Sequence, residues 1–192
     1  MPNPKKFFKE KLNIIAQCSK ILDVGGGVKY SKELKKFRRL LNNCHYQVLD
    51  NNPEINPDIL ADAHDIPLPD KSIDAVICKS LLEHTKNPQK VMDEIFRILK
   101  KGGYCLIYLP FIYPYHGNEV YKDYFRFTID GVGLLTEKFS SKEIITMRGS
   151  LETIFYFFPK FIYQVFRYPA RFFDKLLNKK NQTSGFMIFL QK

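Results

Sequence analysis

The sequence of 192 residues has no tryptophan and only four cysteines. The cysteines, Cys18, Cys44, Cys78 and Cys105, stand singly in mostly apolar surroundings, without the close pairs typical of a zinc site or a disulfide framework. No segment reaches the roughly 18 apolar residues that a membrane-spanning helix requires. The basic residues 1–11 lack the apolar core of a secretory signal. We therefore expect a globular protein of a reducing cytoplasm.

Composition and charge indicate how many domains the protein has and what kind of partner it meets. Hydrophobic residues make up 45% and charged residues 26% of the chain, so we predict one domain over residues 1–192 with a full core. The net charge of +10 is uneven, because residues 1–41 and 151–192 are basic and residues 42–150 are slightly acidic. Enzymes acting on nucleic acid more often surround their site with positive charge, so this distribution disfavours a nucleic-acid partner. It favours either a membrane surface or another polyanion met by the basic ends, or lysines that simply keep the protein in solution.

Segments with strand character alternate with segments of helical character. The predicted strands are Lys20–Val24, His45–Asp50, Ile59–Ala61, Ile73–Lys79, Tyr104–Leu109, a segment near Glu143–Arg148, and Gly185–Gln191. Helices are predicted over Lys32–Leu41, from Pro88 to the pair Gly102-Gly103, and near Ile129–Phe139. This alternation predicts an α/β fold with a doubly wound, mostly parallel sheet and helices on both faces.

The segment Ile21–Gly27 predicts a short buried strand followed by a tight loop. Its consecutive glycines, Gly25, Gly26 and Gly27, let a ligand lie against the backbone, because glycine has no Cβ and adopts positive φ at little cost. In doubly wound folds such a loop lies outside the carboxyl ends of the strands, where ligands bind. The same loop also fits a plain strand-to-helix turn, so this motif alone is a weak predictor.

Acidic residues follow the next two predicted strands. Asp50 ends the second strand, where a carboxylate can accept hydrogen bonds from both hydroxyls of a ribose. Asp62-Ala63 follows the third strand. Each acid alone is typical of a turn, but together, after successive strands, they predict a pocket for an adenosine group.

Five blocks in this order resemble class I S-adenosylmethionine-dependent methyltransferases of the type 11 group. The blocks are Ile21–Gly27, Asp50, Ala61–Val76, Ser80–His84 and Lys100–Gly103. The resemblance covers about residues 20–110 and implies a Rossmann-like fold, S-adenosylmethionine as the cofactor and S-adenosylhomocysteine as the product. A looser pattern over Pro110–Thr128 resembles a bacterial subgroup tied to glycan or lipid modification.

The resemblance implies how the methionine part of the cofactor would be held. The glycines Gly25 to Gly27 would pass under it, Asp23 would hold its amino group directly or through water, and the backbone of Lys79 would border it. The family usually has a third glycine two residues after the second, where this chain has Lys29. Either the loop is rebuilt at that point, or Lys29 pairs with the cofactor carboxylate.

At the adenosine end, the resemblance implies that Asp50 holds the ribose hydroxyls and Asn51 borders the adenine. Asp62 would accept from the exocyclic amine, and the backbone of Ala63 would contact the ring. A dinucleotide-binding dehydrogenase is the competing interpretation. Its fingerprint needs glycine at the position of Tyr30, and the chain has no second nucleotide-binding half.

A hydroxyl acceptor would need a base, and His116 is the candidate. It lies in the loop after the fifth predicted strand, above the carboxyl edge of the sheet. The acceptor pocket would be lined by Tyr113, Tyr115, Tyr124 and Arg126. A packed aromatic lid without substrate contact is the alternative for this loop.

The remaining histidines receive no catalytic role. His84, directly after Glu83, is expected to fix the loop after the fourth strand, and His45 and His64 are expected to be structural or exposed. No acidic cluster is obvious, so we predict no metal. The place of the Asn/Asp-Pro-Pro-aromatic motif of base N-methylases is taken by residues 78–81, which disfavours methylation of a nucleic-base amine.

Residues 151–181, between the last two predicted strands, form a predicted amphipathic helical insert. Apolar residues recur at helical spacing from Phe158 to Leu177, and basic and amide residues, ending at Asn178, recur on the other face. Pro159 and Pro169 each predict the start of a helix. An aromatic face opposite a cationic face is typical of helices at a membrane interface. Packing on the sheet or on a second subunit is the alternative.

The sequence thus predicts a methyltransferase for a small-molecule or a glycan- or lipid-linked acceptor. We expect it in the cytoplasm, with the inner face of the membrane as a candidate meeting place for that acceptor. An RNA methyltransferase and a non-catalytic S-adenosylmethionine-binding accessory protein are the alternatives. A homo-oligomer is left open.

Overall fold

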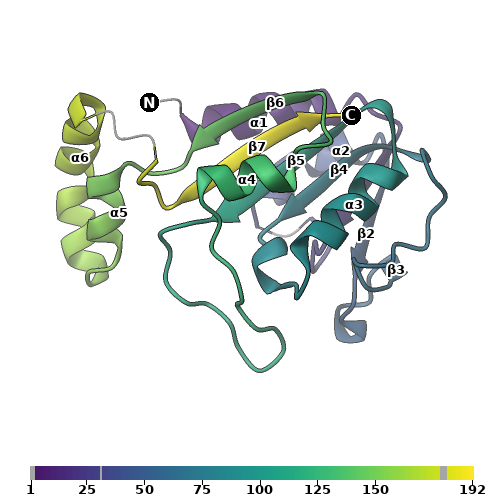
Figure 1. Cartoon of the computed structure of the whole chain (residues 1–192), viewed down its shortest axis with the longest axis horizontal. Coiled ribbons are helices and arrows are strands. Elements are labelled where there is room, and N and C mark those ends of the chain that lie inside the picture. The colour runs from purple at the N-terminus through teal and green to yellow at the C-terminus, as the bar shows by residue number, and fades with distance from the viewer. Residues whose placement is uncertain (1–2, 31, 178–180) are drawn as a thin grey trace.

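A mixed sheet organises the computed structural model, which describes residues 3–30, 32–177 and 181–192 (Figure 1). Its strands are β1 (Lys20–Val24), β2 (His45–Asp50), β3 (Ile59–Leu60), β4 (Ile73–Lys79), β5 (Leu99–Pro110), β6 (Ser141–Thr146) and β7 (Gly185–Gln191). Their order across the sheet is β3-β2-β1-β4-β5-β7-β6. Strands β1 to β5 pair in parallel, and β7 pairs antiparallel with β5 and β6. This arrangement confirms the predicted doubly wound fold.

The central strands are buried along nearly their whole length, as expected for strands covered by helices on both faces. All residues of Ile21–Val24, Ala75–Cys78 and 185–190 are buried. The predicted bounds of β1, β2, β4 and β7 coincide with the observed bounds, because their apolar residues stand out against polar flanks. Strand β6 begins two residues before its predicted start.

The start of β5 differs from the prediction. The sequence places Gly102 and Gly103 at the end of a helix, whereas both lie inside β5, where Gly102 has φ +77°. Both glycines form backbone hydrogen bonds with Lys192. The Gly102 N–H donates to the Lys192 carbonyl at 2.9 Å, and the Lys192 N–H donates to the Gly103 carbonyl at 3.0 Å. The glycines therefore turn the chain within the strand rather than terminate the helix.

Helices cover both faces of the sheet (Figure 1). Helix α1 (Pro4–Ile15), the 3₁₀ turn η1 (Lys32–Phe37) and α2 (Arg38–Leu41) pack on one face. The turn η3 (Leu82–His84), α3 (Pro88–Ile98) and α4 (Ile129–Leu135) pack on the other, and η2 (Pro53–Ile55) follows β2. Each face thus has its own apolar cluster against the sheet.

Two helix starts are explained by their caps. The Asn87 side chain accepts from the Lys90 N–H at 3.1 Å and Pro88 occupies the first turn of α3, which confirms the predicted start. The sequence reasoning missed α1, although Asn3 caps it in the same way. Its many lysines conceal a buried stripe of Phe7, Phe8, Leu12 and Ile15.

The prediction of one α-helix over Lys32–Leu41 is wrong for most of this segment. Its first six residues form the 3₁₀ turn η1, and only the last four form the α-helix α2. Only Leu34 and Leu41 are buried among the side chains described there. Little tertiary packing is therefore available to stabilise a regular helix. Basic side chains three and four positions apart, such as Lys35, Arg38 and Arg39, repel each other in addition.

Between β6 and β7 lie α5 (Ser150–Tyr156) and α6 (Lys160–Leu177), which form a helix pair at one side of the molecule (left in Figure 1). Helix α6 begins directly after Pro159, but Pro169 lies inside α6 and starts no helix, which corrects the prediction. The proline removes one hydrogen bond to the Val165 carbonyl. Water can replace it, because the Val165 residue is 65% exposed. The predicted polar-face residue Asn178 lies outside the described residues.

Within the described residues, no helix has the length and apolarity needed to cross a bilayer.

Candidate functional site

The topology brings the predicted cofactor residues to one edge of the sheet. Strands β1 and β4 are parallel neighbours, and the chain continues from β1 toward β2 on one side and from β4 toward β5 on the other. In doubly wound folds ligands bind at this switch point, outside the carboxyl ends of the strands. Asp23 lies near the end of β1 and the glycine loop follows that strand, Asp50 ends β2, and Lys79 ends β4.

The glycine loop is confined by its neighbours. Gly25 and Gly27 have φ of +68° and +63°, in the left-handed region that favours glycine. A Cβ at Gly25 would lie 2.6 Å from Leu81 Cδ1, and a Cβ at Gly26 would lie 2.6 Å from Asp23 Cγ. The Gly25 N–H donates to the Leu49 carbonyl at 2.8 Å, which fixes the loop to β2. The loop can therefore present only backbone to a ligand.

Beneath the loop, Asp23 is 3% exposed and accepts a short hydrogen bond from the Tyr46 hydroxyl. Burial raises the pKa of Asp23 to about 6, against the lowering effects of the Tyr46 hydrogen bond and the Lys79 charge. Burial and the nearby Asp23 charge raise the pKa of Tyr46, so it stays a donor. Sequence reasoning missed Tyr46, because its contact with Asp23 depends on the pairing of β1 with β2.

At the adenosine end, Asp50 and Asp62 are each partly engaged with backbone. Asp50 Oδ2 accepts from the Gly27 N–H at 3.1 Å, which ties the end of β2 to the glycine loop. Asp62 Oδ1 accepts from the His64 N–H at 2.8 Å and lies 2.6 Å from His64 Nδ1. Ala63 is buried and Asn51 is exposed. A carboxylate accepts about four hydrogen bonds, so both acids retain acceptor sites for a ligand.

Both lysines near the loop pair with carboxylates of the protein. Lys29 Nζ lies 2.9 Å from Asp58 Oδ2, an oxygen that also accepts from the Val48 N–H at 2.8 Å. Lys79 Nζ lies 2.7 Å from Glu33 Oε2. The pairing of Lys29 with Asp58 is an arrangement that the sequence reasoning did not weigh.

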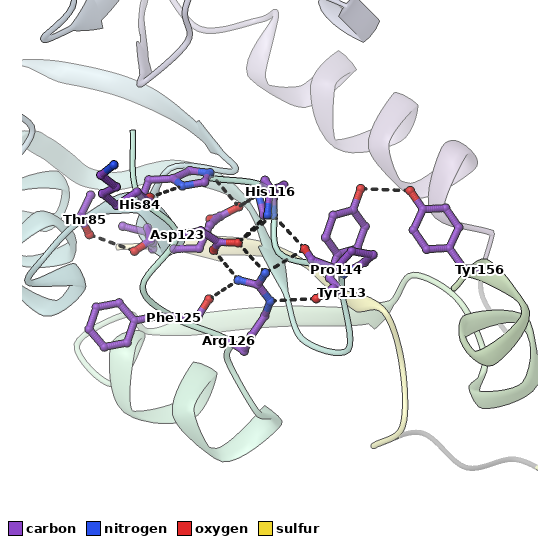
Figure 2. Close-up of polar contacts among 12 residues, drawn as sticks. His84, Thr85, Tyr113, Pro114, His116, Asp123, Phe125, Arg126 and Tyr156 are labelled. Atoms are coloured by element: carbon purple, nitrogen blue, oxygen red, sulfur yellow. Dashed lines mark hydrogen bonds and ion pairs between the residues drawn. The ribbon is translucent and has the colours of Figure 1, made fainter. Parts of the chain in front are cut away.

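The loop after β5 is tied to η3 and held by Arg126 (Figure 2). The N–H groups of Tyr124 and Phe125 donate to the Glu83 carbonyl at 2.8 and 3.2 Å. Arg126 forms a bidentate pair with Asp123 and donates to the carbonyls of Tyr113 at 3.2 Å and Pro114 at 2.9 Å. Its guanidinium thus organises the loop, and its predicted contact with an acceptor stays a prediction.

His116 is oriented by Asp123. Its Nδ1 lies 3.1 Å from Asp123 Oδ2, and the same oxygen accepts from the His116 N–H at 2.9 Å. The hydrogen bond from Arg126 lowers the pKa of Asp123 to about 2 despite burial, so this carboxylate is ionised. With Nδ1 facing the Asp123 carboxylate, Nε2 is the ring nitrogen left to take a proton, which is the arrangement of a histidine base.

The three predicted tyrosines do not converge. Tyr113 packs edge-on to His116, with ring centres 5.3 Å apart, and its hydroxyl lies 3.2 Å from that of Tyr156 on α5. Tyr115 and Tyr124 are 69% and 47% exposed. The structure therefore brings Tyr113, His116 and Arg126 together, and leaves Tyr115 and Tyr124 as predictions.

Sequence reasoning did not predict that Glu83 has a buried carboxylate without a hydrogen-bond partner in the part of the chain that the structure describes. Its carboxylate is fully buried, and neither oxygen has a hydrogen-bond partner within the described residues. Burial raises the pKa of Glu83 to about 7. His84 fixes the loop after β4, as predicted. Its Nδ1 lies 2.7 Å from the Lys122 carbonyl oxygen, and this contact joins the loop after β4 to the loop after β5.

Comparisons with known proteins agree with this geometry. Residues 22–107 match the family of methyltransferase domains. A SAM-dependent methyltransferase from Archaeoglobus fulgidus has a TM-score of 0.65 at 16% identity, over 98% of this chain and 92% of that chain. An uncharacterized protein of Methanocaldococcus jannaschii is 37% identical over 49 residues, which span 26% of this chain and 24% of that protein.

Two further solved structures share the fold. A phosphoethanolamine N-methyltransferase of Haemonchus contortus, in complex with phosphomonomethylethanolamine and S-adenosylhomocysteine, has a TM-score of 0.56 at 16% identity, over 94% of this chain and 52% of that chain. A Haloferax volcanii methyltransferase, in complex with the Trm112 methyltransferase activator, has a TM-score of 0.54 at 17% identity, over 89% and 80% of the two chains. This chain thus spans about half of the first enzyme and most of the second.

Proposed function

We propose that the protein binds S-adenosylmethionine and transfers its methyl group to a small-molecule or glycan- or lipid-linked acceptor. The proposal starts from the match of residues 22–107 to the family of methyltransferase domains and from the shared fold. The observation that carries the proposal is the glycine loop. It is wedged between Leu81 and Asp23 and tied through Gly27 to the Asp50 carboxylate. A cofactor with an amino acid end and an adenosine end fits these donors and acceptors. We treat the chain as one methyltransferase domain.

The residues assigned to the cofactor position it and exclude water. Bound S-adenosylmethionine supplies the electrophilic methyl group. Asp23 would hold the cationic amino group, the glycine loop and the Lys79 backbone would border the methionine part, and Asp50 would hold the ribose. Asn51, Asp62 and Ala63 would surround the adenine. Most of the rate gain in such an in-line transfer comes from alignment of the two reacting atoms.

On the acceptor side, His116 is the proposed proton acceptor for a hydroxyl substrate. Its ring is fixed by Asp123 and by the edge contact with Tyr113. The loop segment that carries it is bonded to η3, which follows β4 at the cofactor edge. Acceptor and cofactor would therefore meet above the carboxyl ends of β4 and β5.

An anionic membrane surface is the proposed meeting place for a lipid-linked acceptor. Helix α6 exposes a run of large apolar side chains: Phe161 at 69%, Val165 at 65%, Phe172 at 62%, Phe173 at 53% and Leu176 at 68%. Basic residues such as Lys160, Arg167 and Lys175 belong to the same helix. An exposed aromatic face with cationic neighbours favours anionic lipid over RNA, which would need positive charge at the site itself.

The cofactor assignment is tested by calorimetric titration with S-adenosylmethionine, S-adenosylhomocysteine and NAD. We expect micromolar binding of the two adenosyl compounds, lost in Asp50→Ala and retained in Asp130→Ala, an exposed aspartate on α4. Binding of NAD alone would move the protein to the dehydrogenase class. Tight cofactor binding without turnover on any extracted acceptor would favour a non-catalytic accessory protein.

The membrane assignment is tested by co-sedimentation with phosphatidylglycerol vesicles and with neutral phosphatidylcholine vesicles. We expect binding to the anionic vesicles that is lost in a Phe161→Ser, Phe172→Ser double variant. A matched change at an exposed leucine far from α6, Leu60→Ser, should leave binding intact. Concentration-dependent dimerisation lost in the same double variant would instead assign α6 to a homo-oligomer interface.

A further inference from the structure

Three ligating side chains from two segments meet above the ends of β4 and β5. Glu83 and His84 belong to η3, and His116 belongs to the loop after β5. One ligand atom from each lies within 4.8 Å of the other two. Glu83 Oε1 lies 3.6 Å from His116 Nε2 and 3.9 Å from His84 Nε2, so both rings turn their Nε2 atoms toward the same carboxylate oxygen.

The Glu83 carboxylate is the unusual member of this group. It is fully buried, and neither of its oxygens has a hydrogen-bond partner among the described residues. Its distances to the two imidazole nitrogens exceed hydrogen-bond length. A buried carboxylate without hydrogen bonds is costly and rare in native proteins, and a coordinated cation is one way to compensate it.

The far side of each imidazole carries the acceptor expected of a metal-binding histidine. His84 Nδ1 lies 2.7 Å from the Lys122 carbonyl oxygen, and His116 Nδ1 lies 3.1 Å from the Asp123 carboxylate (Figure 2). Histidine ligands usually donate their second N–H to a carbonyl or a carboxylate, which fixes the tautomer and leaves the other nitrogen for the metal. Both Nε2 atoms are therefore presented in the ligating form.

The spacing of the three atoms fits a small cation. Zinc bonds of about 2.0–2.1 Å in tetrahedral geometry place two ligand atoms roughly 3.3 Å apart. The separations from Glu83 Oε1, 3.6 and 3.9 Å, exceed this value by about 0.3 and 0.6 Å, and all three ligand atoms lie within 4.8 Å of one another. The side chains would therefore close around the cation by up to about 1.5 Å. Two histidines and one carboxylate form a known catalytic zinc set, in which the fourth position stays open for water or substrate.

We propose that Glu83, His84 and His116 bind a divalent transition-metal cation of the zinc type, with its fourth position open to an acceptor oxygen. The binding itself is independent of the proposed function, and its catalytic meaning rests on that function. The proposal replaces the sequence expectation of no metal, which rested on the lack of an acidic cluster. Here one acid, Glu83, forms the ligand set together with two histidines that are 32 positions apart in the chain.

With the cation present, His116 Nε2 is a ligand and no longer the base. A coordinated acceptor hydroxyl becomes more acidic and loses its proton to water. The acceptor oxygen then forms the bond to the methyl carbon, and the carbon–sulfur bond breaks with its electron pair going to sulfur. The products are the methyl ether, S-adenosylhomocysteine and one proton.

The test is a calorimetric titration of chelator-treated full chain with Zn²⁺, followed by the absorption spectrum of the Co²⁺ form. We expect one Zn²⁺ per chain, a tetrahedral Co²⁺ spectrum without thiolate charge transfer, and at least 10-fold weaker binding in His84→Gln and His116→Gln. Asp123→Asn should weaken binding 10–100-fold through the orientation of His116. His45→Gln, an exposed histidine on β2, is the matched control and should bind as the unaltered chain does.

No stoichiometric Zn²⁺ binding, a thiolate spectrum, or an equal loss in His45→Gln would overturn the proposal. Titration of the same variants with S-adenosylmethionine separates this result from the cofactor assignment. We expect His116→Gln to bind the cofactor unchanged, because the glycine loop is intact. Loss of zinc with retained cofactor binding supports the metal site. Retained zinc in His116→Gln would contradict it whatever the cofactor does.

Discussion

Leu81 fills the space that a side chain at Gly25 would need: its Cδ1 lies 2.6 Å from the Cβ position of that glycine. Leu81 is two residues before Glu83, so one short segment both shapes the cofactor loop and carries the acceptor-side carboxylate. The two halves of the proposed reaction therefore meet at this contact.

We expect Gly25→Ala to abolish measurable cofactor binding. The substitution meets Leu81 and also places an alanine at φ +68°, which costs roughly 1–2 kcal/mol in the left-handed region. Gly27→Ala has a similar φ but no protein atom from the described part of the chain within 4 Å of its Cβ, so it adds the same kind of strain without the contact with Leu81. Calorimetry with S-adenosylhomocysteine measures both variants. Equal losses would show that the backbone, and not Leu81, decides the effect.

Cofactor affinity should depend on pH through Asp23, the buried acid that faces Tyr46, Lys79 and Asp50. With a pKa of about 6, Asp23 is protonated below that pH and cannot pair with the cationic amino group. Affinity should therefore rise as the pH rises through 6 and level off above it. Tyr46→Phe removes a hydrogen bond that lowers this pKa, so the midpoint should move to higher pH.

The same acid also makes stability depend on pH, with the opposite sign. The folded-state pKa of about 6 lies above the ordinary value of 3.8, so the native state binds more protons than the unfolded state between these values. The contribution of Asp23 to the free energy of unfolding should fall by about 3 kcal/mol in total, of which about 2 kcal/mol is lost between pH 4 and pH 6. Urea unfolding of the protein and of Asp23→Asn isolates this slope. A parallel slope in the variant would assign it elsewhere.

Lys29→Ala should leave cofactor affinity unchanged. The lysine already pairs with Asp58 at 2.9 Å, so its loss removes a partly exposed ion pair that contributes at most about 1 kcal/mol. Calorimetry and thermal unfolding measure the two effects separately. A loss of affinity of about tenfold, equivalent to 1.4 kcal/mol, would instead support pairing with the cofactor carboxylate.

Asp174→Ala should release α6 from α5. The Asp174 carboxylate is 1% exposed and accepts from the N–H groups of Leu151 at 2.8 Å and Glu152 at 3.0 Å, so it caps α5 from another helix. Leaving these donors unpaired costs about 1–3 kcal/mol each when they are buried. Limited proteolysis between residues 150 and 177 should accelerate, whereas the exposed neighbour Lys175→Ala should not change it.

Much of the sheet could be predicted because apolar runs between polar loops mark each strand directly. The glycines and acids of β1 and β2 could also be placed, because parallel strands end at one edge. Helix α1 and the turn η1 were harder to predict. The lysines of α1 conceal its buried apolar stripe, and the conformation of η1 depends on tertiary packing. The position of Pro169 inside α6 could not be predicted either, because an exposed helix tolerates a proline that a buried helix would not.

The acceptor side shows where sequence reasoning fails. Nothing local indicates that His84 and His116 face the same oxygen of Glu83, because this depends on how the loop after β5 folds back onto η3. That fold is set by Arg126 and Asp123, whose pairing orders the loop from within. The residues were visible in the sequence, but their convergence depends on long-range backbone contacts.

The position of β7 has a consequence for synthesis of the chain. Among the strands that the structure describes, β6 pairs only with β7, and β7 separates it from β5. About 40 residues lie between β6 and β7 in sequence, so this pairing is distant along the chain. While the ribosome makes α5 and α6, β6 has no partner strand and β5 presents an open edge. Open edges invite pairing with other chains. Nascent chains that stop before β7 should therefore be the aggregation-prone species, whereas the cofactor edge of β1, β2 and β4 can already be assembled.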